Sequence, residues 1–450
     1  MTKLSFAVRR REPLLVGPLA ETPRETKRLS DTDDQEILRM HVPFIFFYRG
    51  GQQQAHDHDE AEDRHDPVAV IRRAVGEALV PYYPLAGRVR EIEGRKLVVD
   101  CTGEGVLFVE ADADVRMAEL EAAADNGLMK APFPCLDQLL FDVPGFGGVL
   151  NCPLLLIQVT RLLCGGFVLA VRFNHTISDA TGIAQYISAV AELARGFPAP
   201  TLVPAWSRDI LEARNPPNPS FPHREFDAVP TTTLPPPGDM VTRTFNFTSA
   251  DVAAIIKFLP RDTTCTTFEA LTAAVWRART AALDLPPAEE IRLVPITNFR
   301  NRAPELALPA GYYGNACAFP TVVTTSGALL AGSLADAVDL VRNARGSVTA
   351  AYVRSMMDLL VLRGRPCLAL ANVYVVSDTR RAGFHRVDFG WGEPVYGGPA
   401  DTLFMASFLV AVNNGGGEDA VAVPVMLPRP AMDRFASEIQ MMLNALPEGF

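Results

Sequence analysis

The sequence of 450 residues lacks the short motifs of several common enzyme classes. It has no G-x-x-x-x-G-K-[ST] pattern, so a P-loop nucleotide site is not expected. It has no G-x-S-x-G pattern, which argues against an α/β-hydrolase nucleophile. The seven cysteines never form C-x-x-C, and their odd number disfavours a disulfide framework. We therefore expect reduced thiols, no structural zinc site and a cytoplasmic protein.

Positive charge and long apolar runs are also scarce. Lys and Arg number 42 against 52 Asp and Glu, a net charge of −10, and no basic cluster occurs, so we expect no nucleic-acid partner. No stretch approaches the ~20 apolar residues of a membrane span, so we expect no membrane association. The acidic stretch 55–66 carries His56, His58 and His65, but no hydrophobic frame surrounds them. We interpret it as a solvated surface loop and predict no metal site.

A proline-rich segment, residues 215–239, divides the chain into two nearly equal halves. Proline cannot donate to a β-ladder and stiffens the chain, so this segment is predicted to link an N-terminal domain, 1–214, to a C-terminal domain, 240–450. Both halves mix strand and helix patterns, which predicts an α/β (α+β) fold with large sheets. We expect strands near 153–160, 167–173, 291–296, 370–376 and 404–412, and helices near 183–193, 268–276 and 432–442.

The strongest chemical signal is the run Asn-His-Thr-Ile-Ser-Asp-Ala-Thr-Gly at 174–182. His175 follows a predicted buried strand, Asp179 comes four residues later, and Gly182 opens a predicted helix. An imidazole with an ordinary pKa near ~6.5 suits a general base at neutral pH. A histidine with a purely structural hydrogen bond, or a metal ligand paired with Asp179, stays open as an alternative.

A second signal is Asp-Phe-Gly-Trp-Gly at 388–392. Gly390 and Gly392 permit backbone angles with positive φ and a close approach of the chain to another surface. By itself the pattern predicts a tight turn in which Asp388 is the carboxylate partner.

The ordered pair of motifs, H-x-x-x-D and then D-F-G-W-G, resembles the BAHD acyl-CoA-dependent acyltransferases of plants. Pro-Leu-Ala-Gly-Arg at 84–88, Thr-Phe-Glu-Ala-Leu at 267–271 and Tyr-Tyr-Gly-Asn at 312–315 match the same family. The N-terminal segment 23–36 is similar to the branch that contains benzyl alcohol O-benzoyltransferases. The resemblance covers essentially the whole chain. It implies two chloramphenicol-acetyltransferase-like domains with a solvent channel between them.

The resemblance also implies roles for residues near the reaction. His175 is expected at the centre of the channel, as the general base in a ternary complex of acyl-CoA and alcohol. Ser377 matches a hydroxyl that faces the tetrahedral intermediate, and Trp391 is expected to line the channel. Lys257 is a candidate for binding the phosphates of CoA, although an exposed helix lysine would have the same sequence context.

Other motif residues are expected to be structural. In the family, the carboxylate equivalent to Asp179 points away from the cleft and pairs with an arginine, which Arg300 matches. Asn298 stands where many members have Asp, so the local salt-bridge network is expected to differ here. Asp388, with Gly390 and Gly392, is expected to hold its loop across the interface between the halves.

We expect an O-acyltransferase that uses acyl-CoA as co-substrate, with no permanently bound cofactor, and acts as a monomer. The N-terminal resemblance favours transfer of benzoyl from CoA to benzyl alcohol or a similar small alcohol. Transfer of acetyl or hydroxycinnamoyl groups, N-acylation, and an inactive binding relative stay open. A covalent mechanism through Cys164 or Cys317 is disfavoured, because their apolar surroundings are typical of inert thiols.

Overall fold

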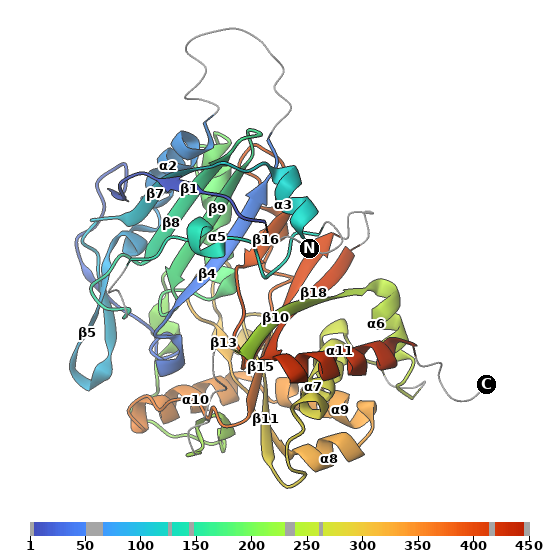
Figure 1. Cartoon of the computed structure of the whole chain (residues 1–450). Helices are drawn as coiled ribbons and strands as arrows, with labels where there is room; N and C mark the ends of the chain where they lie inside the picture. Colours follow the sequence, from blue (N-terminus) through green and yellow to red (C-terminus); the bar gives the residue numbers. More distant parts are fainter. Residues whose placement is uncertain are drawn as a thin grey trace.

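Two large β-sheets with helices packed against them form the molecule (Figure 1). The computed structural model describes residues 4–50, 66–124, 128–143, 148–229, 239–260, 264–413 and 419–444. The predicted surface loop with His56, His58 and His65 lies outside the described residues. Within the described ranges, no helix is long and apolar enough to cross a membrane. The same ranges hold no group of three or more His, Cys, Asp or Glu side chains arranged to bind a metal ion.

The first sheet has seven strands in the order β1-β7-β8-β9-β4-β16, and β2 also pairs with β7. Six of these strands come from the first half of the chain. The seventh, β16, comes from the second half and pairs antiparallel with β4. The second half therefore completes one edge of the first sheet. The bounds are β1 Val8–Arg10, β2 Leu14–Val16, β4 His41–Tyr48, β7 Val106–Ala113, β8 Leu155–Leu162, β9 Phe167–Asn174 and β16 Tyr396–Pro399.

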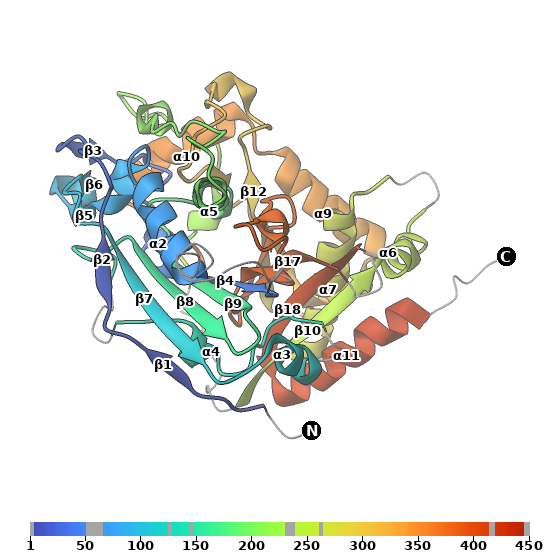
Figure 2. The same ribbon diagram turned by 90° about the horizontal axis from the view of Figure 1, so that it is seen from above.

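Both faces of this sheet are buried, which explains why its central strands are apolar at nearly every position. In β9, Phe167 and Leu169 point into a core with the helices α2 and α5, whereas Val168 and Ala170 point into a second core with α3 and α4. The alternation follows from the two-residue period of a strand. Figure 2 shows α2 and α5 together over the same face. The helices are α2 Pro67–Ala78, α3 Met117–Ala123, α4 Leu136–Leu139 and α5 Ala180–Ala194.

The second sheet has the order β10-β18-β17-β15-β11-β14. One face packs on α6, α7, α9 and α11, while Val410 and Ala422 on its other face join the second core of the first sheet. That shared core joins the two halves of the chain. The strands are β10 Met240–Thr248, β11 Glu290–Pro295, β14 Val322–Thr325, β15 Val373–Asp378, β17 Ala406–Asn413 and β18 Asp419–Pro428; the helices are α6 Ser249–Ile256, α7 Thr267–Leu283, α8 Ser326–Ala331, α9 Leu334–Gly346 and α11 Arg429–Asn444.

Two small sheets and one more helix complete the fold. The pair β12-β13 lies beside the loop that follows β9, and the sheet β3-β6-β5 lies near the N-terminal segment. The helix α10 centres a separate apolar core. The bounds are β3 Thr26–Arg28, β5 Arg88–Glu91, β6 Leu97–Asp100, β12 Thr297–Asn298, β13 Cys317–Ala318 and α10 Ala350–Leu362.

The described part of the proline-rich segment, 215–229, is anchored rather than free. Asp358 on α10 accepts hydrogen bonds from the backbone N–H groups of Arg214 (2.8 Å) and Asn218 (2.7 Å). Ser355 on the same helix accepts from the N–H of Phe221 at 3.0 Å. Residues 214–221 are therefore held against α10, and the domain limits at 214 and 240 stay a prediction.

The secondary-structure expectations agree with the structure apart from element ends. The helix expected over 268–276 continues to Leu283, and the C-terminal helix begins at Arg429 instead of Met432. In α7, alanine, arginine and threonine residues extend the helix beyond the apolar stripe. Packing against α9 and α11 stabilises this extension, which a periodicity argument does not capture.

Candidate active site

The loop between β9 and α5 carries His175. Its backbone N–H donates to the carbonyl of Met40 at 2.9 Å, next to β4. Its own carbonyl accepts from Asn315 Nδ2 at 2.8 Å, from the second half of the chain. Partners from both sides thus fix the backbone of His175.

The imidazole of His175 combines a closed side with an open one. Nδ1 is buried and has no hydrogen-bond partner among the described residues, whereas the residue as a whole is partly exposed. The Phe173 ring lies 5.5 Å from the imidazole, centroid to centroid. Burial lowers the pKa of His175 below its ordinary 6.5, and Asp179 and Asn315 oppose this only in part. A neutral imidazole at physiological pH can accept a proton.

Asp179 turns its carboxylate to the second half of the chain and does not orient the imidazole through a hydrogen bond. It caps α5 by accepting from the N–H of Gly182 at 3.0 Å, and it accepts from the N–H of Ala316 at 2.9 Å. Arg300 donates to both carboxylate oxygens, at 2.7 and 3.0 Å. Burial alone would raise the pKa of Asp179, but Arg300 and the backbone donors reverse this and hold it below 3.8.

Arg300 and Asn298 extend this contact. Arg300 Nη2 also donates to the carbonyl of Gly314 at 2.6 Å. Asn298 donates to the Thr181 hydroxyl at 3.1 Å and accepts from the N–H of Arg300 at 3.0 Å. The amide at position 298 thus links the two loops without adding a second carboxylate beside Asp179. The ion pair implied by the family resemblance is present, and its structural role stays a prediction.

The segment 312–316 packs directly on the loop of His175. Ser178 donates its hydroxyl proton to the carbonyl of Tyr313 at 2.8 Å. Gly314 has no room for a side chain, because a Cβ there would lie 1.0 Å from Arg208 Nη1. Arg208 in turn donates to the carbonyl of Ile177 at 2.8 Å. The glycine therefore makes room for the guanidinium of Arg208, which comes from the first half of the chain.

Asp33 and Asn315 hold the site together, and the sequence analysis assigned neither a role. Asp33 is fully buried and accepts from the N–H of Asn315 (2.9 Å) and its Nδ2 (2.8 Å). The same Nδ2 donates to the carbonyl of His175. The sequence contained a sign of the role of Asp33. The run 30–36 was used only to compare the chain with a branch of the family, yet it holds several acidic residues close to one another.

A buried charge cluster fixes the N-terminal run in place. Lys96 Nζ lies 2.9 Å from Asp31 and 3.0 Å from Asp34. Arg365 Nη2 lies 3.1 Å from each of the same two carboxylates. All four side chains are almost fully buried, so the carboxylates depend on these cations. The cluster positions Asp33 between them.

Ser377 lies near the C-terminal end of β15, where the neighbouring strand leads into β12. The backbone N–H of Ile296 donates to the carbonyl of Val376 at 2.9 Å, so Ser377 follows the point at which the chain turns toward Asn298 and Arg300. Its side chain is partly exposed and forms no hydrogen bond to another described residue. The role of its hydroxyl in the reaction stays a prediction.

Trp391 lies at the far end of β9 from His175, and its expected place beside the channel stays a prediction. Its ring packs 5.4 Å from the ring of Phe167, the first residue of β9, whereas His175 follows the last. Eight strand residues span roughly 25 Å at about 3.3 Å each. The ring of Trp391 thus packs on the first core from its partly exposed position, about the length of β9 away from the imidazole.

The carboxylate of Asp388 makes its hydrogen bonds within its own loop, and its role in holding that loop across the interface stays a prediction. It accepts from the N–H groups of Gly390 (2.7 Å) and Gly392 (2.8 Å), both within its own loop. Those glycines have φ of +108° and +85°, which other residues rarely adopt. The contact across the interface comes instead from neighbouring residues: Phe389 packs on Tyr48, whose hydroxyl donates to the carbonyl of Val387.

The cysteines considered as nucleophiles are unsuited to that role. Burial, and then the charge of Asp179, raise the pKa of Cys317 well above its ordinary value. Its Sγ lies 3.5 Å from Asp179 Oδ2, a polar contact that was not expected. Cys164 is exposed in the turn between β8 and β9, at the end of β9 away from His175. Lys257 is exposed at the end of α6, and its predicted contact with CoA stays a prediction.

Comparison with known proteins identifies the family. The sequence profile described as the Transferase family matches residues 6–442. A benzyl alcohol O-benzoyltransferase of Petunia hybrida is 50% identical over 98% of this chain and 95% of its own length. The chain belongs to the BAHD acyltransferase family. A benzyl alcohol O-benzoyltransferase of Nicotiana tabacum shows the same identity and coverage. An alcohol acyltransferase of Actinidia chinensis is 46% identical over 99% of this chain and 96% of its own.

Solved structures confirm the BAHD fold. Vinorine synthase matches with a TM-score of 0.72 at 21% identity, over 97% of this chain and 98% of its own. The F. graminearum TRI101 structure, described as complexed with coenzyme A and T-2 mycotoxin, matches with a TM-score of 0.70 at 16% identity, over 92% and 97%. The expected fold of two chloramphenicol-acetyltransferase-like domains is thus confirmed, while the solvent channel at His175 stays a prediction.

Proposed function

We propose that this BAHD acyltransferase transfers a benzoyl group from benzoyl-CoA to benzyl alcohol or a similar small alcohol. The observation that carries the proposal is the imidazole of His175: partly exposed, neutral at physiological pH, and held by backbone contacts from both halves of the chain. The relatives named benzyl alcohol O-benzoyltransferase, at 50% identity over nearly the full length, support the choice of substrates.

The proposed reaction needs no covalent intermediate on the enzyme, because a thioester is already activated. The alcohol oxygen forms a bond to the thioester carbon while His175 Nε2 accepts the hydroxyl proton. General-base assistance of this kind contributes about 10²- to 10⁴-fold. The C–S bond then breaks, and the imidazolium returns the proton to the CoA thiolate, so ester and free CoA leave.

The negative charge on the tetrahedral intermediate requires a hydrogen-bond donor. The hydroxyl of Ser377 has no partner among the described residues, and we assign it this role. A donor aimed at the developing oxyanion is worth up to about 10²- to 10³-fold in rate. Asp179 and Arg300 act on the loop and do not touch the reacting atoms.

The aromatic rings nearest His175 belong to the core of the first sheet. Phe173 lies 5.5 Å from the imidazole, centroid to centroid, and packs on Phe44, and both are at most 2% exposed. The choice of aromatic substrates therefore rests on the named relatives.

A substrate matrix tests the proposal. Purified protein is mixed with benzoyl-, acetyl- or p-coumaroyl-CoA and with benzyl alcohol, hexanol or benzylamine, and both free CoA and the acylated product are measured. We expect the highest kcat/KM for benzoyl-CoA with benzyl alcohol. A preference for another donor or for the amine would replace the substrates proposed, and no release of CoA from any pair would indicate an inactive binding relative.

A further inference from the structure

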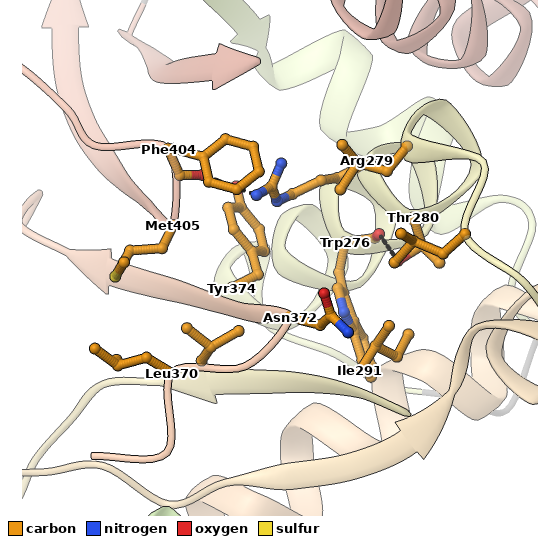
Figure 3. Close-up of a pocket in the computed structure, with 12 residues that line it drawn as sticks. Trp276, Arg279, Thr280, Ile291, Leu370, Asn372, Tyr374, Phe404 and Met405 are labelled. Atoms are coloured by element: carbon orange, nitrogen blue, oxygen red, sulfur yellow. Dashed lines mark hydrogen bonds between the residues drawn. The ribbon is translucent and has the colours of Figure 1, made fainter. Parts of the chain in front are cut away.

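A pocket in the second half of the chain lies between α7, β11, β15 and the segment with Phe404 and Met405 (Figure 3). It includes Tyr374, near the start of β15, whereas Ser377 is near the end of that strand. The walls are mainly apolar, and the cavity of about 40 Å³ holds roughly three water molecules. Apolar side chains that line it include Trp276, Leu283, Ile291, Leu370, Tyr374 and Phe404.

One cation, Arg279, lines this apolar pocket. Figure 3 shows its side chain reaching from α7 toward the rings of Phe404 and Tyr374. The guanidinium carbon lies 4.5 Å and 5.0 Å from these two ring centroids, and Nη2 donates to the carbonyl of Phe404 at 2.8 Å. The side chain is 4% exposed. The rings and one carbonyl therefore hold the guanidinium without neutralising it.

Arg279 has no carboxylate within salt-bridge distance among the residues that the structure describes, and its buried Nη1 has no hydrogen-bond partner there. Burial lowers the pKa of Arg279 to about 10, and Tyr374 opposes this only in part, so the group stays charged at neutral pH. A buried charge without a counter-ion is unfavourable. The pocket therefore presents an unsatisfied donor and an uncompensated positive charge together.

The chemistry of the walls narrows the class of ligand. A phosphate would need several donors, but the Asn372 amide already donates to Glu289 and the Thr280 hydroxyl to the carbonyl of Trp276. A carboxylate needs only the guanidinium, and its hydrocarbon part gains from apolar walls. The exposed Glu289, which accepts from the Asn372 amide of the pocket wall, adds a nearby negative charge that disfavours anions of high charge.

We propose that the pocket binds a small organic carboxylate, with its oxygens on Arg279 Nη1 and its hydrocarbon part against Trp276, Ile291 and Leu370. This site is additional to the reaction site at His175 and does not depend on the proposed substrates. An acid of the size of butyrate or benzoate would fill the cavity and extend toward its mouth, where Leu283 is only partly buried.

Thermal unfolding of the full-length chain tests the proposal. Sodium acetate, butyrate and benzoate are titrated against the neutral amides of the same shape and against sodium chloride at equal ionic strength. Because a ligand that binds the folded state raises Tm, we expect butyrate or benzoate to raise it where their amides and chloride do not. Arg279→Met should weaken the apparent Kd at least about 10-fold, whereas Arg72→Met, at an exposed helix position, should leave it unchanged.

Two further measurements keep the outcome decisive. If Arg279→Met does not fold, Leu283→Trp narrows the mouth while keeping the guanidinium, and it should reduce the carboxylate-dependent Tm shift. A crystal grown with 4-bromobenzoate should show the bromine anomalous signal in this pocket. Any of three results would overturn the proposal. The unmodified chain could show no Tm shift specific to carboxylates, or the shift could persist in the folded Arg279→Met variant or in Leu283→Trp. The third is a bromine signal found only at other positions.

Discussion

The segments 174–182 and 388–392 carry the two strongest motifs of the sequence, and their polar side chains have opposite surroundings in the structure. The first leaves an imidazole partly exposed, with a nitrogen that no described residue bonds. The second closes on itself, because the Asp388 carboxylate accepts from two N–H groups of its own turn. A motif thus identifies a family, whereas the exposure and the hydrogen bonds of its side chains show which of them can still contact a substrate.

The largest effect that would sharpen this contrast comes from His175→Ala. Loss of the proposed general base should lower kcat by at least about 100-fold without changing the unfolding midpoint by more than a few degrees. Steady-state kinetics with benzoyl-CoA and benzyl alcohol, together with thermal unfolding, measure both. Near-normal turnover would remove His175 from the mechanism.

Asp179→Ala tests whether the other motif residue of the first loop is structural. It leaves the buried Arg300 guanidinium without its partner and should cost about 3–5 kcal/mol in the free energy of unfolding, measured in urea. The double variant Asp179→Ala/Arg300→Met should recover part of the loss, because no buried charge is then unpaired. A single variant that unfolds normally but is inactive would show that Asp179 serves catalysis.

Asp388→Ala should affect stability more than chemistry. It removes two hydrogen bonds within a partly exposed turn, so we expect a loss of about 1–2 kcal/mol in the free energy of unfolding. The kcat of the folded variant should remain within about threefold of the unmodified chain. A drop in kcat as large as that of His175→Ala would show that the 388–392 loop also takes part in the reaction.

Asn315→Ala should loosen the backbone of His175. It removes the bond from Nδ2 to the carbonyl of His175 and the bond to Asp33, so we expect kcat to fall about 10-fold with a smaller change in KM. Asn315→Gln, which retains the amide on a longer stem, should restore part of the rate if positioning is the cause. If kcat/KM fell by the same factor because KM rose while kcat stayed unchanged, Asn315 would serve substrate binding instead.

The smallest expected effect is on pH dependence. Protonated His175 cannot accept a proton, and burial lowers its pKa, so the acid limb of kcat/KM should have its midpoint below pH 6.5. At higher pH His175 is neutral, so its titration should cause no further change in kcat/KM. An acid limb centred above 6.5 would mean that the imidazolium is stabilised, contrary to its burial.

Some of the site followed from residues close in sequence. The apolar strand before His175, the helix after Asp179 and the turn chemistry of the 388–392 glycines are local properties, so the sequence predicted them. The pairing of Asp179 with Arg300 spans 121 residues and was available only through the family resemblance. Asp33 and Asn315 received no role, because neither the acidic run at 30–36 nor the motif at 312–315 shows which distant residues its side chains contact.

The sequence by itself determined the family, the mixed α/β architecture and the identity of the proposed base, because these depend on motifs and on local apolar patterns. Only the tertiary structure decided that Trp391 packs at the far end of β9, that β16 completes the first sheet, and that Arg279 is buried without a counter-ion. Burial and partner choice arise when segments distant in the chain pack together, and that packing sets which polar groups remain free to act.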